Sequence, residues 1–437
     1  MAITALSLLA TFRAAAQQCL SAVRGAPAWT AGSLLLVAGL FRAAQNMGQT
    51  TFSLLGRDRL GLGSTAIGSL GAVVGVFALT STLVVGTRFP SAKAFRAVRM
   101  GVTLLTAALA VFGTSTSAWQ FTAGAVLLGV AGGTTTPSLA TAVAQTSPAG
   151  RDRALARYTV VLSLSLILGP LLETGLLTAT GQQLRLVFFI FAPLPLIALV
   201  LGIGWRSAGA SNKTAMVGRT CYSESFAYVS ASTTDATEAP LVGGSPGPIR
   251  LRSLLATSGG RMGLTVQLLY AVPFSEVTVF GALVARSEFK MTAAGAQFGF
   301  TLFFATSLLS RLLVARLSPI KGKRRVFISA AVLTVAGTAM LAHGGSAWGL
   351  VAAMVLLGIP HGVTFPLALA LIANSSAPER LAAANAALFA TTNAVSVVAP
   401  LVLGAVASAA GYRIMSAAVL VPVTVFMALL LLQRPPR

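Results

Sequence analysis

The chain has 437 residues, of which 55% are hydrophobic and only 9% are charged. Soluble domains carry about 25% charged residues, so a water-soluble fold of this length would lack the polar surface that it needs. The net charge of +22 would suit a nucleic-acid partner, but no basic run lies in a polar, foldable segment. We therefore expect lipid to be the solvent for most of the chain, and we expect no nucleic-acid partner.

Apolar stretches of about 20 residues, the length that crosses a bilayer as a helix, occur twelve times. In the first half they are 29–52, 67–85, 99–116, 119–142, 158–178 and 184–203. In the second half they are 262–284, 294–314, 326–343, 348–372, 382–407 and 414–432. These runs are continuous, whereas the strands of a membrane β-barrel alternate between apolar and polar residues. The sequence predicts an all-α membrane protein.

Two polar segments lie outside these spans. Residues 1–27 contain two arginines and no acid, and we expect a lead-in that lies on the cytoplasmic face of the membrane; a targeting segment is the alternative. Residues 206–261 are rich in Ser, Thr and Gly and are too polar to fold alone, which predicts a flexible cytoplasmic linker. The chain thus divides into the lead-in, a six-helix bundle over 28–205, the linker and a second bundle over 262–433.

The second half of the chain repeats the first at a constant offset. Trp119 recurs as Trp348 and Gly133 recurs as Gly362, in each case 229 positions later. A duplicated and very apolar chain is what a carrier with two bundles requires, because alternating access needs two similar halves that rock around one site.

The basic residues predict the orientation. With both termini placed in the cytoplasm, most of the 31 Lys and Arg residues fall on cytoplasmic segments, Arg311 counted among them, and Arg42 falls within a span. This asymmetry follows the positive-inside rule. It predicts a multi-pass protein of the cytoplasmic (inner) membrane with both termini inside, in contact with anionic lipid headgroups.

No group of residues indicates metal, cofactor or catalytic chemistry. Cys19 and Cys221 provide too few ligands for a metal site, and His343 and His361 lack metal-ligand spacing. No glycine-rich loop of the kind that holds the phosphates of ATP is present. We expect neither an enzyme nor a bound cofactor.

Twelve spans, a six-plus-six repeat, a long central loop and cytoplasmic termini together resemble the major facilitator superfamily, over residues 29–432. Locally, the segment 60–68 resembles the family's loop between helices 1 and 2. The family's Gly-x-x-x-Asp-Arg-x-Gly-Arg-Arg loop is degenerate, because segment 86–99 and its counterpart 316–325 keep basic residues but have no Asp. The resemblance implies two pseudo-symmetric six-helix bundles and a monomeric secondary transporter that works by alternating access.

The segment 164–175 contains Gly169-Pro170 and resembles the helix 5 motif of the drug/proton antiporter branch, with Glu173-Thr174 in place of the trailing glycine pair. Glycine lets a neighbouring helix approach closely, and proline removes a backbone hydrogen bond and permits a bend. This resemblance implies efflux and a conformational role for Gly169 and Pro170.

Few ionisable residues fall inside the predicted spans, and each costs about 2.5–3.5 kcal/mol on insertion scales. Glu276, Glu173 and His361 are candidates for carrying a coupling proton, and a histidine ordinarily changes charge near neutral pH. A carboxylate whose ion pair forms in one state and breaks in the other would bind and release a proton during the cycle. The alternative is a permanent bridge from Arg42 to Glu276 or Glu173 that only holds helices together.

Polar residues of helix 1 and aromatic residues of helix 7 are candidates for substrate binding. Arg42, Gln45 and Asn46 are three or four positions apart and share one helix face. Tyr270 and Phe274 are expected to share a face with Ser275 or Glu276 of helix 7. In the resembling fold, helices 1 and 7 both line the central cavity, so these five residues are expected to contact the substrate.

We expect a secondary active transporter that couples proton movement to efflux of lipophilic or amphiphilic compounds. One alternative is uptake or exchange of a small organic anion bound by Arg42, because a guanidinium group can hold a carboxylate or phosphate bidentately. An alternative of another class is a non-transporting membrane receptor or scaffold. The expected partners are a small-molecule substrate, protons and membrane lipids.

Overall fold

The computed structural model describes residues 31–88, 94–146, 151–203, 255, 257–316, 323–375 and 381–433. Within these ranges the chain is helical apart from short turns. The predicted lead-in, 1–27, and nearly all of the predicted linker, 206–261, lie outside the described residues.

The first half of the chain forms one helical bundle. Its helices are α2 (Ala31–Leu60), α3 (Ser64–Arg88), α4 (Ala94–Thr114), α5 (Ala118–Thr146), α6 (Arg151–Ala179), α7 (Leu184–Phe191) and α8 (Pro193–Ile203). The sixth predicted span is divided into α7 and α8, because Pro193 has no amide hydrogen to continue the hydrogen-bond ladder of α7. α2 continues past the predicted end at 52, since Leu54 and Leu55 are buried inside the bundle.

The second half forms a matching bundle. Its helices are α10 (Ser258–Glu288), α11 (Ala293–Arg316), α12 (Lys323–His343), α13 (Ala347–Asn374) and α14 (Leu381–Leu432). α14 contains the last two predicted spans, because the backbone leaves the helical conformation at Gly411, with φ 84° and ψ 171°. Glycine has no Cβ and adopts this positive φ at little cost. The limbs 381–410 and 412–432 are the fifth and sixth members of the bundle.

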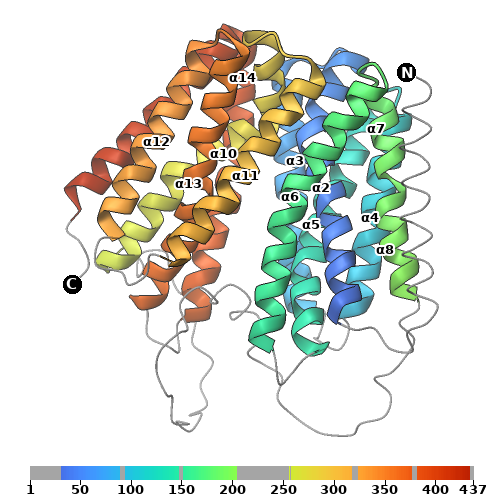
Figure 1. The fold of residues 1–437 in the computed structure, drawn as a ribbon, viewed down its shortest axis with the longest axis horizontal. Helices are drawn as coiled ribbons and strands as arrows, with labels where there is room; N and C mark the ends of the chain where they lie inside the picture. Colours follow the sequence, from blue (N-terminus) through green and yellow to red (C-terminus); the bar gives the residue numbers. More distant parts are fainter. Residues whose placement is uncertain are drawn as a thin grey trace, which may run out of the picture.

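The two bundles are built alike. Gly133 of α5 lies so close to α3 that a Cβ atom there would meet the Ala78 carbonyl, and Gly362 of α13 lies similarly close to the Ser307 carbonyl of α11. Ser307 follows Ala78 by the same 229 positions that separate the two glycines. The same close helix contact, which small residues permit, therefore occurs once in each half. The predicted all-α fold of two pseudo-symmetric six-helix bundles is confirmed (Figure 1).

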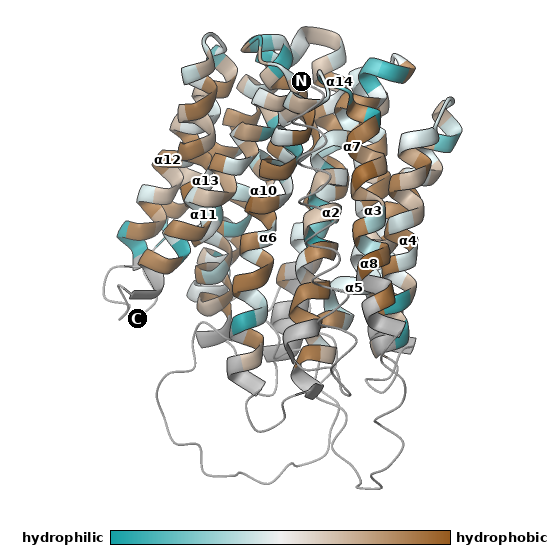
Figure 2. Ribbon diagram, turned by 45° about the vertical axis from the view of Figure 1, so that its right-hand side comes forward, coloured by the Kyte–Doolittle hydropathy of each residue, from teal (hydrophilic) through white to brown (hydrophobic). Residues whose placement is uncertain are grey.

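The surface of the helices suits a bilayer. Hydrophobic residues cover most of their length, and hydrophilic residues gather toward their ends (Figure 2). Among the described residues, nine helices are long and apolar enough to cross a membrane, with the two-limbed α14 counted once. Large apolar side chains such as Leu83 and Leu309 are more than half exposed, at 58% and 59%. Such extensive exposed apolar surface indicates contact with lipid.

The bundles meet at one end of the molecule, the short-loop face, which carries the turns 61–63, 180–183, 289–292 and 344–346. There α3 packs against α14, α6 against α11 and α2 against α10. A Cβ atom at Gly68 would meet the Pro400 carbonyl, and the Ser64 hydroxyl lies 3.0 Å from the Tyr412 hydroxyl. These contacts seal the short-loop face between the two halves of the chain.

Candidate functional site

Glu173 is joined to the opposite bundle through a single hydroxyl group. It lies on α6, and its Oε1 accepts a hydrogen bond from Thr51 of α2. The Thr51 hydroxyl accepts a hydrogen bond from Nε2 of Gln297 on α11 at 3.0 Å, and Thr50 donates to Oε1 of the same amide at 3.4 Å. All four side chains are buried. We call these four residues, Glu173, Thr51, Thr50 and Gln297, the interbundle relay.

Glu276 has a different kind of partner. It accepts a hydrogen bond from Ser416, on the second limb of α14, and both residues are fully buried inside the C-terminal bundle. Met47, which precedes Glu276 by the repeat offset, is equally buried in the N-terminal bundle. Glu276 therefore occupies a position that faces the interior of its own bundle. The repeat offset was a signal in the sequence that could have indicated this.

The two glutamates share one further property. Within the described residues, Oε2 of Glu173 and Oε2 of Glu276 are both buried without a hydrogen-bond partner. A buried carboxylate with neither a cation nor a full set of donors is unfavourable when ionised. Both groups thus have the environment of an acid that holds a proton.

Arg42 pairs with neither glutamate. It is half-buried in the middle of α2, and its Nη1 donates to Oε1 of Gln45 at 2.9 Å. One turn further on, Asn46 donates to the Leu166 carbonyl of α6 at 3.2 Å. Among the described side chains, Asp58 pairs with Arg286 and Glu288 pairs with Arg413. The permanent Arg42 bridge considered from the sequence does not form in this structure.

Arg311 is a functional candidate that the sequence alone does not single out. The charge asymmetry predicts it at the cytoplasmic end, yet it is half-buried on α11 and reaches across to Ser163 of α6, where Nη1 and Oγ are 3.5 Å apart. Its position inside the predicted span 294–314, separated by four apolar residues from Arg316, was the signal that could have found it.

Four aromatic rings from two helices of the C-terminal bundle, α10 and α11, surround His361 of α13. The His361 ring stacks on Phe274 at 4.6 Å between centroids and 13° between planes, and it lies 5.1 Å from the Phe303 ring. Tyr270 and Phe304 lie 5.5 Å and 6.0 Å from it. We call these residues, with His361, the aromatic cluster. Tyr270 and Phe274 thus face His361, whereas Glu276 faces α14.

The Gly169-Pro170 step lies beside Arg42. A Cβ atom at Gly169 would come within 2.9 Å of the Ala43 carbonyl of α2, so the glycine permits α6 to pack directly against the helix that carries Arg42. Pro170 lies inside α6, and its carbonyl accepts a hydrogen bond from Thr174 at 2.8 Å. This step fixes how closely the two helices approach next to the arginine.

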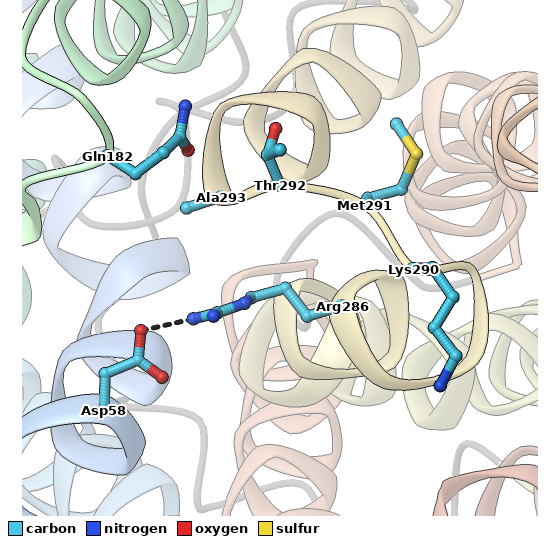
Figure 3. A pocket seen from close by; sticks show the side chains of 7 residues that line it. All are labelled: Asp58, Gln182, Arg286, Lys290, Met291, Thr292 and Ala293. Atoms are coloured by element: carbon cyan, nitrogen blue, oxygen red, sulfur yellow. Dashed lines mark hydrogen bonds and ion pairs between the residues drawn. The ribbon is translucent and has the colours of Figure 1, made fainter.

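A pocket of about 280 Å³ lies at the junction of the bundles on the short-loop face (Figure 3). The ion pair between Asp58 of α2 and Arg286 of α10 crosses it. Nearby, Gln182 accepts a hydrogen bond from the Ala294 amide at 2.9 Å. These polar contacts add to the seal between the halves.

Among the described residues, no group of three or more His, Cys, Asp or Glu side chains could hold a metal ion.

Solved structures that resemble this chain include several transporters. They include the nucleoside transporter NupG, with a TM-score of 0.71 at 13% identity over 92% of this chain and 99% of that one. A POT family transporter in complex with 5-aminolevulinic acid gives a TM-score of 0.68 at 10% identity, over 92% and 95% of the two chains. A bacterial homologue of the human lysosomal transporter Spinster, inward-facing and unoccupied, gives 0.66 at 13% identity, over 92% and 96%. At these identities the likeness concerns the fold alone.

No curated protein sequence matches the chain. The Major Facilitator Superfamily matches it over residues 34–275 and 255–437, which together are nearly the whole length. The paired bundles, the apolar helices and this match agree. The chain belongs to the Major Facilitator Superfamily, and it is a multi-pass membrane protein of secondary active transport, not an enzyme.

Proposed function

We propose that this chain is a proton-coupled transporter that exports small amphiphilic compounds. The observation that carries the proposal is the interbundle relay, in which buried Glu173 is hydrogen-bonded through Thr51 to Gln297 of the opposite bundle. Because the relay lies where the halves meet, its contacts break whenever the short-loop face opens. The proton on Glu173 and the position of the bundles are thereby linked.

The link follows from solvation. Closing the short-loop face over an ionised Glu173 would bury an unpaired charge, whereas closing it over the neutral acid would not. Of the charged groups on the helices packed against it, Asp58 on α2 is paired with Arg286 of α10, and Arg311 on α11 contacts Ser163. Thr51 donates the hydrogen bond that Glu173 accepts, and the other carboxyl oxygen of Glu173 has no hydrogen-bond partner within the described residues. Protonation therefore favours the closed face, and loss of the proton favours the open one.

Glu276 provides a comparison within the same chain. Its partner Ser416 belongs to the same bundle, so their hydrogen bond does not need to break when the halves move. We assign to Glu276 the smaller part in coupling. His361, enclosed by the aromatic cluster, likewise has its ring contacts within the C-terminal bundle.

The direction of transport is proposed from the Gly169-Pro170 step. Its resemblance to the helix 5 motif of the drug/proton antiporter branch and its packing against Ala43, next to Arg42, both support export. The proposed setting is the cytoplasmic membrane, with the short-loop face outside, both termini and the linker 206–261 inside, and a monomer surrounded by lipid. The lead-in 1–27 and the bundles 28–205 and 262–433 complete this arrangement.

The coupling can be tested without knowing the substrate. Cys19 and Cys221 are first replaced by serine. Arg57 and Lys290, which are exposed on the two sides of the short-loop face, are then each replaced by cysteine and spin-labelled. In lipid nanodiscs, interlabel distances measured by double electron–electron resonance should lengthen as the pH is raised. Glu173→Gln should hold the short distance at every pH, whereas Glu276→Gln should change the response much less.

A pH response that survives Glu173→Gln, or that disappears only with Glu276→Gln, would refute the relay as the coupling element. The same variants are then compared in proteoliposomes under an imposed pH gradient, in a flux screen of amphiphilic compounds. Glu173→Gln is expected to abolish gradient-driven flux and exchange of compound alike, because a short-loop face that stays closed releases no compound on that side. Proteoliposomes in which the orientation of the protein is known show whether the compound is exported or taken up.

A further inference from the structure

Two arginines from opposite bundles converge on the same stretch of α6. Arg311 approaches Ser163 to 3.5 Å, and Asn46, one turn from Arg42, donates to the Leu166 carbonyl. Ser163 and Leu166 are one helical turn apart. Arg42 precedes the last residue of α2 by as many positions as Arg311 follows the first residue of α11. Both guanidinium groups therefore lie at a similar depth below the short-loop face.

The positive charge of this pair is not balanced by the described acids. Four acidic side chains are described, and each is engaged elsewhere: Asp58 with Arg286, Glu173 with Thr51, Glu276 with Ser416, and Glu288 with Arg413. The contacts of Arg42 and Arg311 are instead neutral, namely the Gln45 amide and the Ser163 hydroxyl. Within the described residues, Nε of Arg311 is buried and has no hydrogen-bond partner.

Two like charges that face each other at low dielectric repel strongly. A buried charge normally has a counter-charge, since leaving it unpaired is destabilising. An anion placed between the two guanidinium groups would turn this repulsion into two attractions. Arginine is also the side chain whose planar fork matches a carboxylate bidentately.

The aromatic cluster adjoins the arginine pair. Phe303 and Phe304 precede Arg311 on α11 by two helical turns, which places them on the same side of that helix. His361 contacts both of these rings, with centroids 5.1 Å and 6.0 Å away. Phe274 and His361 are each only half-buried, so part of their ring surface is open to a ligand. A flat apolar group can stack there while its charged end reaches the arginines.

We infer that Arg42 and Arg311 form an anion-binding site shared by the two bundles, and that the substrate is a small aromatic carboxylate whose ring packs on Phe274 and His361. The inference rests on the proposed function, because it names the substrate class of that transporter. An aromatic carboxylate of this kind is both amphiphilic and negatively charged.

The position of the site gives binding a consequence for the cycle. Without an anion, repulsion between Arg42 and Arg311 opposes closure of the end of the molecule opposite the short-loop face. With an anion bound to both, the two bundles share one ligand and the repulsion is removed. Substrate binding would therefore favour closing that end, which is the differential binding to two states that alternating access requires.

Equilibrium binding tests the site directly. The probe is 2-naphthoate, and its neutral counterpart is 2-naphthamide, both titrated by calorimetry into the purified full-length chain in detergent at one pH. Naphthoate should bind and the amide should bind much more weakly. Arg42→Gln and Arg311→Gln should each lower naphthoate affinity by about tenfold or more, in line with loss of a charged hydrogen bond. The matched control is Arg413→Gln, because that arginine is exposed and pairs with Glu288; its affinity should equal that of the parent.

Two further comparisons make the result specific. Arg42→Lys keeps the charge and the fold but loses the planar fork, and it should weaken naphthoate binding although the thermal melting of the ligand-free protein is unchanged. Phe274→Ala should lower the affinity for naphthoate more than the affinity for acetate. Inorganic phosphate serves as the non-aromatic anion and should bind weakly.

The inference is overturned if naphthoate and naphthamide bind alike, if neither binds, or if both Arg→Gln variants bind as the parent does. Phosphate binding as tight as that of naphthoate would overturn the aromatic assignment. These outcomes are separate from those for Glu173, since binding is measured without a pH change or gradient. A failed pH response with intact naphthoate binding removes the coupling proposal alone.

Discussion

Glu173 of α6 and Gln297 of α11 belong to different bundles, yet both are hydrogen-bonded to the Thr51 hydroxyl. Thr51 uses its proton toward the carboxylate and its lone pair toward the amide, so it transmits a change in one partner to the other. This contact spans 122 residues in one direction and 246 in the other. A buried acid is thereby placed in contact with the part of the molecule that must separate.

Thr51→Val should uncouple Glu173 from the opposite bundle. Valine has nearly the same shape but no hydroxyl group, so it leaves the buried carboxyl group unsatisfied, at a cost of about 1–3 kcal/mol. The distance between labels at Arg57 and Lys290 should then lose most of its pH dependence. Thr50→Val is the control, because Thr50 contacts Gln297 but not Glu173. An unchanged pH response in Thr51→Val would contradict the relay.

Ser416→Ala should affect stability and not coupling. It removes the hydrogen bond to Glu276 inside the C-terminal bundle, which should lower the free energy of unfolding by about 1–3 kcal/mol. Thermal denaturation in detergent measures this loss, and Glu276→Gln in the same background should recover part of it. The pH response of the short-loop face should be that of the parent. A variant with normal melting and no pH response would reverse the roles given to the two glutamates.

Gly68→Leu should prevent closure of the short-loop face. A Cβ atom at Gly68 already meets the Pro400 carbonyl of α14, so a larger side chain forces α3 and α14 apart. Overpacking of this kind typically costs about 1–3 kcal/mol, and here the cost falls on the closed state alone. Label distances should be long at every pH. Gly63→Leu is the control, since a Cβ atom at Gly63 has no neighbour within 4 Å.

The ion pair between Asp58 and Arg286 should make a small contribution to closure. Both side chains are 39% exposed, and exposed pairs contribute about 0–1 kcal/mol and are screened by salt. Asp58→Asn should therefore raise the open population by less than about fivefold, with a smaller effect at high salt. The exchanged pair, Asp58→Arg with Arg286→Asp, should restore the parent distances. A larger, salt-insensitive effect would show that the pair has another role.

Arg42→Lys distinguishes the two classes of substrate in transport. The ammonium group keeps the charge but cannot bind a carboxylate bidentately, so flux of 2-naphthoate should fall by about tenfold or more. Flux of a neutral amphiphile, where one is carried, should change only modestly. Proteoliposomes loaded with each compound provide the measurement. An equal loss for both compounds would argue for a structural role of Arg42.

The sequence by itself determined the solvent, the number of spans and the duplication. These follow from local properties: runs of apolar residues must cross a bilayer as helices because their backbone groups find no partners in lipid, and a constant offset makes two halves fold alike. Gly133 and Gly362 show this, because each makes the same close contact within its own bundle. The sequence also placed Arg42, Gln45 and Asn46 along one helix face.

Only the tertiary structure decided which ionisable groups meet. The helices are apolar on nearly every side, so hydropathy does not fix their rotation about their own axes, and that rotation decides what each side chain faces. Glu276 turns toward Ser416, 140 residues away, and Arg311 reaches Ser163 over 148 residues. The approach of Arg311 to α6 and the partners of both glutamates depend on six-helix packing and on how the bundles dock, which no local pattern encodes.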